Sequence, residues 1–306
     1  MYYLETKSNN PYYNLAFEET VLRTETKGDF LMLWQNDNTI VIGCNQNTIG
    51  QINIEAVRKY NVNVVRRQTG GGAVYHDLGN LNYSFITDED ESGIAFERFT
   101  GPIVAALNKL GLDASASGRN DILVDGKKVS GVAQKHLNNR VLHHGTLLFS
   151  ENLDMANEVL AVDPEKIKAK GVDSVKSRIT NISEELKKIG KELTLEEFWD
   201  YIREELTAEH VEQIELSKDQ LSAIEKLKEE KYDTWEWNYG KSLEADIIEK
   251  KRIEGIGGVE LQLKLNHGII TDAKLYGDVM DPEMLIGRAE KIIGKIYNRD
   301  ILDEIF

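Results

Sequence analysis

The amino-acid sequence predicts an α+β fold, in which helices pack on a mixed β-sheet, followed by a small C-terminal α+β domain. Three observations support this prediction. Residues 1 to about 180 alternate short β-like runs with helical stretches, hairpin signals occur among those runs, and the composition shifts to Glu, Lys and Leu from about residue 183. The mixed order of the elements argues against a regular β-α-β winding.

The first half of the chain carries clear element signals. Residues 11–23, "PYYNLAFEETVLR", read as a helix, and residues 30–34 and 39–43 read as strands around the turn-forming "QNDN". A further helix is expected over residues 100–111, where Gly101-Pro102 would start it and a glycine would stop it.

Amphipathic helices are expected after residue 183. Thr194 and Glu197 have the spacing of a capping box, as do Ser217 and Gln220. The charge runs of these helices are most simply solvent-exposed faces, and no chemistry is inferred from them.

The C-terminal region has its own pattern. Beyond the aromatic connector at 233–242, residues 257–277 alternate apolar and polar side chains on either side of a turn. A helix is expected to follow, with Asp281 as its cap. We therefore expect a large catalytic domain, residues 1–242, and a small accessory domain, residues 243–306.

Composition and charge exclude several classes. The formal net charge of -15 argues against a protein that primarily binds nucleic acid, because phosphate contacts need a basic face. No apolar run approaches the roughly 18 residues of a membrane span, and the N-terminus lacks the pattern of an export signal, so we expect a cytoplasmic protein. The single cysteine, Cys44, rules out an internal disulfide and a multi-thiolate zinc site.

A glycine triplet lies in "RRQTGGGAVYHDLGNLNYSF", residues 66–85. It is not a P-loop, and Tyr75 at the sixth position excludes the dinucleotide fingerprint. Alternation directs Arg66 and Arg67 to opposite faces, so one guanidinium and the backbone N–H groups could converge on an anion. A glycine-rich turn without a ligand is the alternative.

A hairpin is predicted in "GRNDILVDGKKVSG", residues 118–131, because an Asp-Gly pair separates two alternating runs. Leu123 would then oppose Lys128, and Asp121 would oppose Ser130 on the same face. Lys127 would share the opposite, apolar face and reach solvent from the hairpin tip. An ammonium group held at Lys128 could bind a carboxylate and a phosphate together, although a solvated surface lysine is the simpler reading.

His144 and Gly145, in "HHGTLLF", could contribute ring or backbone polar atoms to a site. Neighbouring residues of a strand point to opposite faces, so a joint zinc site with His143 is not expected.

These stretches together resemble the lipoate-protein ligase A family. "GRNDILVDGKKVSGVAQK", "HHGTLLF" and "GVDSVKSRITNI" follow the glycine segment in the family's order, and "NPYYNLAFEE", "TIVIGCNQN" and "WEWNYGKS" match it as well. The resemblance implies a mixed-sheet catalytic domain of the biotin and lipoate ligase type with helices packed on it. It also implies a two-step reaction, in which lipoate and Mg-ATP give lipoyl-AMP and pyrophosphate, and a lysine of a lipoyl domain then takes the lipoyl group.

The resemblance also implies acceptors and site residues. The acceptors would be apo lipoyl domains of 2-oxoacid dehydrogenase E2 subunits and the glycine cleavage H protein. Lys128 matches the lysine that contacts the lipoate carboxylate and the α-phosphate, and residues 171–182 match a loop that orders over the adenylate. Mg²⁺ would be held through the phosphates, with Asp121 as a candidate ligand and no other metal ligand assigned. The residues expected to bind ATP or lipoyl-AMP are Arg67, Gly71, Gly72, Ala73, Val74, Tyr75, Asn80, Asn120, Asp121, Lys128, His144 and Gly145.

Two other functions stay open. An ATP-independent octanoyl or lipoyl transferase of the same fold would need a thioester-forming cysteine, and the chain has no cysteine after "HHGTLLF". A non-catalytic lipoyl-binding protein should lose Lys128 or Arg67, and both are present.

Overall fold

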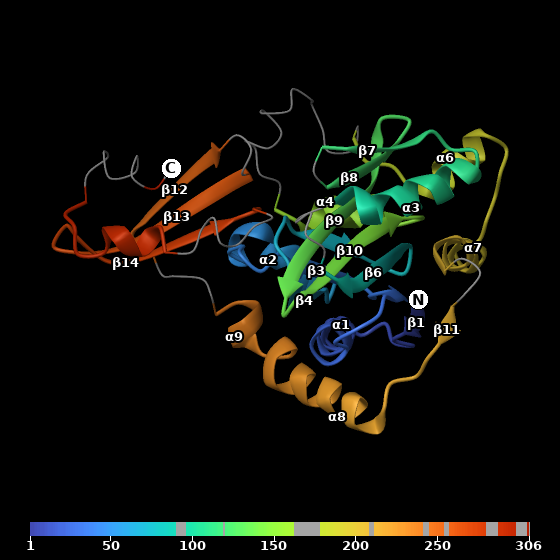
Figure 1. The fold of residues 1–306 in the computed structure, drawn as a ribbon. Coiled ribbons are helices and arrows are strands. Elements are labelled where there is room, and N and C mark those ends of the chain that lie inside the picture. Colours follow the sequence, from blue (N-terminus) through green and yellow to red (C-terminus); the bar gives the residue numbers. More distant parts are fainter. Residues whose placement is uncertain are drawn as a thin grey trace.

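The computed structural model describes residues 1–89, 96–118, 120–161, 178–207, 211–240, 245–253, 257–279, 287–297 and 305. Figure 1 shows a main body of sheet and helices, with a C-terminal sheet beside it. The predicted α+β fold is confirmed. The expected domain boundary at 242/243 lies outside the described residues. Within the described part of the chain, no helix is long and apolar enough to cross a membrane.

The main sheet is mixed. The strand that comes first along the polypeptide, β1, runs parallel to both of its neighbours in the sheet, and the remaining strand pairs are antiparallel. The order of its eight described strands is β11 (Glu212–Gln213), β1 (Tyr2–Glu5), β2 (Phe30–Trp34), β6 (Asn80–Asp88), β10 (Arg140–Leu148), β9 (Lys127–Leu137), β8 (Asp121–Val124) and β7 (Ala114–Ser117).

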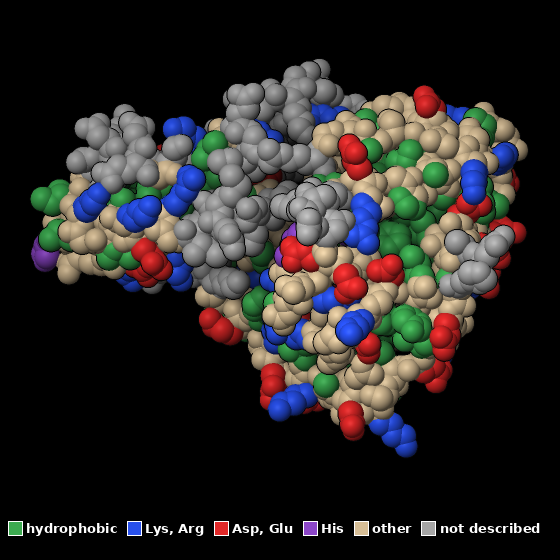
Figure 2. All heavy atoms as spheres, viewed as in Figure 1, with side chains coloured by type: hydrophobic (Ala, Val, Ile, Leu, Met, Phe, Trp, Pro, Cys, Tyr) green, Lys and Arg blue, Asp and Glu red, His purple; other side chains and the backbone are tan. Residues whose placement is uncertain are grey.

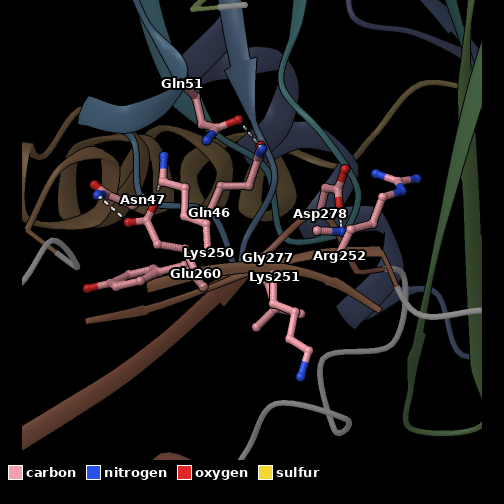
Figure 3. A pocket seen from close by; sticks show the side chains of 12 residues that line it. Gln46, Asn47, Gln51, Lys250, Lys251, Arg252, Glu260, Gly277 and Asp278 are labelled. Carbon is pink, nitrogen blue, oxygen red and sulfur yellow. Dashed lines mark hydrogen bonds and ion pairs between the residues drawn. The ribbon is translucent and has the colours of Figure 1, made fainter. Parts of the chain in front are cut away.

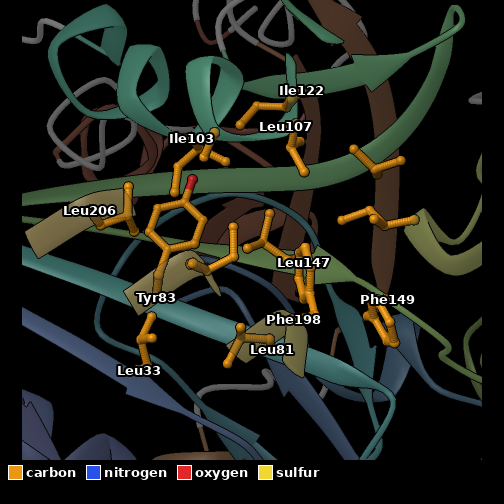
Figure 4. Close-up of a cluster of buried hydrophobic side chains, with 14 of the residues drawn as sticks. Leu33, Leu81, Tyr83, Ile103, Leu107, Ile122, Leu147, Phe149, Phe198 and Leu206 are labelled. Atoms are coloured by element: carbon orange, nitrogen blue, oxygen red, sulfur yellow. The ribbon is translucent and has the colours of Figure 1, made fainter. Parts of the chain in front are cut away.

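Helices cover both faces of this sheet. Because side chains alternate along a strand, β2 contributes Leu33 to one core and Trp34 to the other. The first core, drawn in Figure 4, includes residues of α3 (Phe96–Lys109) and α7 (Leu195–Thr207). The second core includes residues of α1 (Pro11–Thr24) and α8 (Lys218–Leu227). The short helix α6 (Ile182–Lys188) packs into the first core.

A second sheet carries the glycine segment. It consists of β4 (Asn63–Arg66), β3 (Thr39–Ile42) and β5 (Val74–His76), in that order. Residues of α2 (Ile54–Lys59) and α4 (Leu153–Val159) pack with this sheet. The glycines therefore connect β4 to β5 beside an ordered core. Shorter elements are the 3₁₀ turn Ile49–Gln51, the π turn Lys228–Tyr232 and α9 (Trp235–Asn238).

The C-terminal sheet is antiparallel, in the order β12 (Ile247–Ile253), β13 (Gly257–Asn266) and β14 (Ile269–Gly277). The predicted hairpin is confirmed, and Leu261 and Leu263 are buried on its apolar face. A 3₁₀ turn covers Ala289–Ile292. The cap expected at Asp281 lies outside the described residues.

Most local predictions agree with the structure. The helix expected at 11–23 is α1, and both capping boxes form. The predicted start of the third helix is wrong, because α3 is already helical at Phe96 and Pro102 lies inside it. Pro102 is the seventh residue of α3, where it removes one backbone hydrogen bond without ending the helix, so a rule that places proline at the first helical position misplaces the boundary.

The face drawn in Figure 2 carries acidic and basic side chains interspersed over the main body. Lys and Arg side chains also gather on the C-terminal strands in this view.

Candidate functional site

Lys128 lies on the hairpin formed by β8 and β9. Its Nζ is 2.7 Å from Oδ1 of Asp121, and the two side chains are 33% and 26% exposed. Asp125 and Gly126 both have positive φ, as the predicted tight turn requires. The hairpin therefore fixes a partly exposed ammonium group beside a carboxylate.

The predicted register of this hairpin is partly wrong. Leu123 opposes Lys128 as expected, but Asp121 opposes Gly131 instead of Ser130. A β-bulge between Ile122 and Leu123 shifts the pairing by one residue. A Cβ on Gly131 would lie 3.0 Å from the Lys128 Nζ, so the absent side chain leaves room for the lysine to reach Asp121.

A second segment borders Lys128. The Lys128 N–H donates to the carbonyl of Arg178 (2.7 Å), and the Thr180 N–H donates to the Lys128 carbonyl (3.0 Å). Residues 171–177 of the predicted adenylate loop lie outside the described residues. Its described end pairs with the backbone of Lys128. Nε and Nη2 of Arg178 are buried and have no hydrogen-bond partner within the described part of the chain.

Arg67 organises the glycine segment from within. Its guanidinium donates to the carbonyls of Gly70 (2.6 Å) and Gly72 (2.8 Å), and its Nε donates to the Thr69 hydroxyl (3.0 Å). Burial lowers the pKa of Arg67 to about 10, so it stays charged at neutral pH. In this structure the guanidinium holds the loop carbonyls, and contact with phosphates stays a prediction.

Arg66 is buried on the other side of the same strand. It is 0% exposed, and its guanidinium donates to carbonyls of the 43–46 turn, to Thr48 and to the 237–238 backbone. Arg66 therefore joins three segments of the chain, and no part of it faces an open site.

The backbone after Arg67 is shaped by its glycines. Gly71 has a φ of +89°, which side-chain-bearing residues rarely adopt, and its N–H donates to the Val279 carbonyl at 3.0 Å. The C-terminal segment after β14 thus contacts the loop directly. Tyr75 is buried in a hydrophobic core, and the side chains of Ala73 and Val74 pack against hydrophobic cores while remaining partly exposed.

His144 belongs to a buried series of hydrogen bonds. Its Nε2 lies 2.8 Å from the Thr69 hydroxyl, and its Nδ1 lies 2.8 Å from Oε1 of Glu18. The structure therefore brings His144 together with the residue that precedes the glycine triplet. Nearby, burial and then the charge of Arg67 lower the pKa of His76 to about 3, so this ring is neutral.

The remaining predicted site residues are Asn120, Asn80 and Gly145, and each lies in a different environment. The Asn120 carbonyl accepts the Val132 N–H (2.9 Å) beside Asp121. Asn80 is buried, and its Nδ2 donates to Asn82. Gly145 is paired with Tyr83 in the sheet, and a Cβ at this position would lie 2.5 Å from the Tyr83 hydroxyl oxygen, so the glycine leaves room for that side chain.

Sequence reasoning missed Glu18, Thr69 and Arg178. Glu18 lies in α1, whose residues from Asn14 to Leu22 are all buried, and only the assembled fold shows that this acidic side chain is 0% exposed. In the sequence, two adjacent glutamates normally indicate a solvent-exposed position.

A polar pocket lies between the main body and the C-terminal sheet, as Figure 3 shows. Gln46 and Asn47 contribute to one side of it, and Lys250, Glu260 and Asp278 to the other. Asn47 donates to Glu260 (3.1 Å) across this pocket. Among the described residues, no group of three or more His, Cys, Asp or Glu side chains could hold a metal ion.

Two family models match this chain. Residues 10–207 match the lipoyl protein ligase A/B catalytic domain, and residues 242–306 match the bacterial lipoate protein ligase C-terminus. The chain belongs to the lipoate-protein ligase family and is a ligase enzyme.

Individual relatives match over nearly the whole chain. Lipoate-protein ligase LplJ of Bacillus subtilis is 39% identical over 303 residues, which cover 97% of this chain and 90% of the relative. Lipoate–protein ligase 1 of Staphylococcus aureus is 39% identical over 304 residues, which cover 97% of this chain and 92% of the relative.

Solved structures share the fold. LipL1 of P. falciparum in complex with lipoate has a TM-score of 0.77 at 27% identity, covering 99% of this chain and 92% of that one. A bipartite ligase from Thermoplasma acidophilum, studied with its E2 lipoyl domain, has a TM-score of 0.69 at 29% identity, covering 80% and 98%. A lipoate-protein ligase A bound with ATP has a TM-score of 0.66 at 27% identity, covering 78% and 97%.

Proposed function

We propose that this protein activates lipoate with ATP and transfers the lipoyl group to a lysine of apo lipoyl domains. In the first step, a lipoate carboxylate oxygen attacks the α-phosphorus, which forms lipoyl-AMP and releases pyrophosphate. In the second step, the acceptor amine attacks the lipoyl carbonyl carbon, an amide forms, AMP leaves and the amine loses a proton. The acceptors proposed are E2 subunits of 2-oxoacid dehydrogenases and the glycine cleavage H protein.

One observation carries this proposal: the Lys128 ammonium group is fixed by Asp121 (2.7 Å) and by backbone pairing with residues 178–180. Joining a carboxylate to a phosphate brings two anions together, and a preorganised positive charge lowers the cost of that approach. The solved relatives support these substrates, since one is in complex with lipoate, another is bound with ATP, and a third was studied with its E2 lipoyl domain.

The other site residues are proposed in the following roles. Lys128 acts as an electrostatic clamp, and backbone atoms of Gly71 to Tyr75 approach the nucleotide. Asn80, Asn120, Asp121 and His144 border the same site. Mg²⁺ would supply positive charge at the phosphates, and because Asp121 already binds Lys128, phosphate oxygens would be its main ligands.

We also propose that residues 1–242 form the catalytic domain and residues 243–306 the accessory domain. The two family matches, to 10–207 and to 242–306, support this division.

The experiment combines the protein, lipoate, ATP, Mg²⁺ and an apo lipoyl domain. We expect AMP release and a lipoyl mass gain on the acceptor lysine, and neither without ATP. Transfer from an octanoyl acyl carrier without ATP, together with no gain from free lipoate, would identify a transferase instead. Binding of lipoate without any transfer would identify a non-catalytic binding protein.

A further inference from the structure

Glu18 presents a buried carboxylate at the centre of the main body. It lies on α1, is 0% exposed, and accepts hydrogen bonds at Oε1 from the Ser84 hydroxyl (2.6 Å) and from His144 Nδ1 (2.8 Å). Its other oxygen, Oε2, is buried without a partner among the described residues. Burying a carboxylate and leaving one oxygen unpaired costs stability, so core packing alone gives a poor reason for this residue.

The hydrogen bonds around Glu18 have a defined direction. A carboxylate oxygen accepts, so His144 donates from Nδ1. The other ring nitrogen, Nε2, lies 2.8 Å from the Thr69 hydroxyl. On the other side, Trp34 Nε1 donates to Ser84 (2.9 Å), and Ser84 donates to Glu18.

Thr69 connects this series of hydrogen bonds to the glycine segment. Its hydroxyl oxygen accepts from Nε of Arg67 (3.0 Å) and lies in hydrogen-bond contact with Nε2 of His144 (2.8 Å). The same guanidinium holds the carbonyls of Gly70 and Gly72. A continuous series of hydrogen bonds thus runs from Glu18 through His144 and Thr69 to Arg67.

We propose that Glu18 is a positioning residue for adenylate formation. Through His144 and Thr69 it sets the orientation of Arg67, and Arg67 sets the backbone of Gly70 to Gly72 before the nucleotide arrives. A preorganised loop avoids reorganisation during the reaction, which is how supporting residues raise a rate without touching the substrate. This inference rests on the proposed function, because it assigns the loop to the nucleotide.

The test measures kcat and KM of ATP- and lipoate-dependent lipoyl-AMP formation. Glu18→Gln keeps the shape and the acceptor oxygen but removes the charge, and Thr69→Val keeps the shape but removes the hydroxyl. We expect each to lower kcat/KM for ATP by about 10- to 100-fold, and Thr69→Ser to restore most of what Thr69→Val loses. Because both residues act through the same series of hydrogen bonds, the double variant should lose no more kcat/KM than about the larger of the two single losses.

Glu19→Gln is the matched control. Glu19 is equally buried on the same helix, but its carboxylate binds Lys231 (2.5 Å), Tyr232 and Arg23. None of these residues belongs to the series of hydrogen bonds from Glu18 to Arg67. We expect this variant to unfold more easily and to keep its kcat and KM when folded.

The outcomes separate this inference from the proposed function. If the unaltered protein forms no lipoyl-AMP, the proposed function fails. If the unaltered protein does form lipoyl-AMP, either of two results overturns the inference. One is a kcat/KM of Glu18→Gln equal to that of the unaltered protein. The other is a double variant in which the losses of Glu18→Gln and Thr69→Val multiply. Should Glu18→Gln not fold, equal activity of Thr69→Val and Thr69→Ser would also overturn it.

Discussion

The ammonium group of Lys128 and the carboxylate of Asp121 form an ion pair of 2.7 Å on neighbouring strands of one hairpin. The pair crosses a β-bulge, and the lysine passes over Gly131 to reach its partner. Both side chains remain partly exposed, so the charge is oriented and still accessible to a ligand. Such a pair contributes little to folding, usually less than about 1 kcal/mol, and its effect should appear in activity.

Lys128→Ala should abolish most lipoyl-AMP formation while the fold stays intact. Removing one electrostatic donor from a transition state typically costs about 10²- to 10³-fold in rate. Lys127→Ala is the matched control, because Lys127 opposes Val124 and points to the other face of the hairpin. Pyrophosphate release and thermal unfolding of both variants provide the measurement, and equal losses of activity would contradict the assignment of the two faces.

Gly131→Ala should displace the Lys128 ammonium group at little cost in stability. The new Cβ would lie 3.0 Å from Nζ, and the flexible end of the lysine can move away. Because small misplacements of a catalytic group cost rate steeply, we expect adenylation to fall by about 10-fold or more.

Gly101→Ala is the control for this substitution, since Gly101 lies in α3 and no atom outside its chain neighbours lies within 4 Å of its hypothetical Cβ. It should leave activity unchanged, and we expect no gain in stability, because a Cβ on the helical residue before Pro102 is disfavoured. Full activity in Gly131→Ala would show that the exact place of the ammonium group is unimportant.

The sequence predicts the hairpin but not its bulge. The bulge leaves Val129 without a pairing partner on β8, because Lys128 opposes Leu123 and Ser130 opposes Ile122. The bulge arises where β9 must pair with β8 and then continue beside β10, and that is a property of the whole sheet. Strict alternation therefore places Lys128 on the correct face of the hairpin, but it pairs Asp121 with Ser130 instead of Gly131.

The buried series of hydrogen bonds lies beyond any local pattern. Glu18 and His144 are separated by 126 positions, and Thr69 and His144 by 75. Their residue types are also common at surfaces, so neither spacing nor composition indicates that they meet. The two arginines before the glycines illustrate the same limit, because both guanidinium groups bind loop carbonyls, and carbonyl positions depend on backbone conformation.

Arg66→Lys should destabilise the protein severely. The guanidinium is 0% exposed and binds the 43–46 turn, Thr48 and the backbone of Trp237 and Asn238. Lysine keeps the charge but cannot reproduce a planar fork with several donors, so buried carbonyls would lose their partners. We expect a loss of at least about 3 kcal/mol in the free energy of unfolding, measured with urea. The exposed Arg58→Lys is the control, and a loss below about 1 kcal/mol at Arg66 would contradict this role.

Glu151→Gln should stabilise the protein increasingly as the pH rises. Burial, and then the charge of Asp77, raise the pKa of the Glu151 carboxyl well above its ordinary value of 4.5. Above about pH 4.5 the unfolded chain releases this proton while the native protein keeps it, so native stability falls with rising pH until the native pKa is reached. Glutamine removes this pH dependence of stability, because its side chain carries no ionisable proton. Urea unfolding from about pH 5 to about pH 8 should show the variant gaining on the unaltered protein by at most about 1.4 kcal/mol per pH unit. Other titrating groups, such as the buried His76, are common to both proteins and cancel in this difference. The exposed Glu192→Gln should show no such gain, and a difference between Glu151→Gln and the unaltered protein that stays constant across this range would mean that Glu151 is already ionised in the folded state.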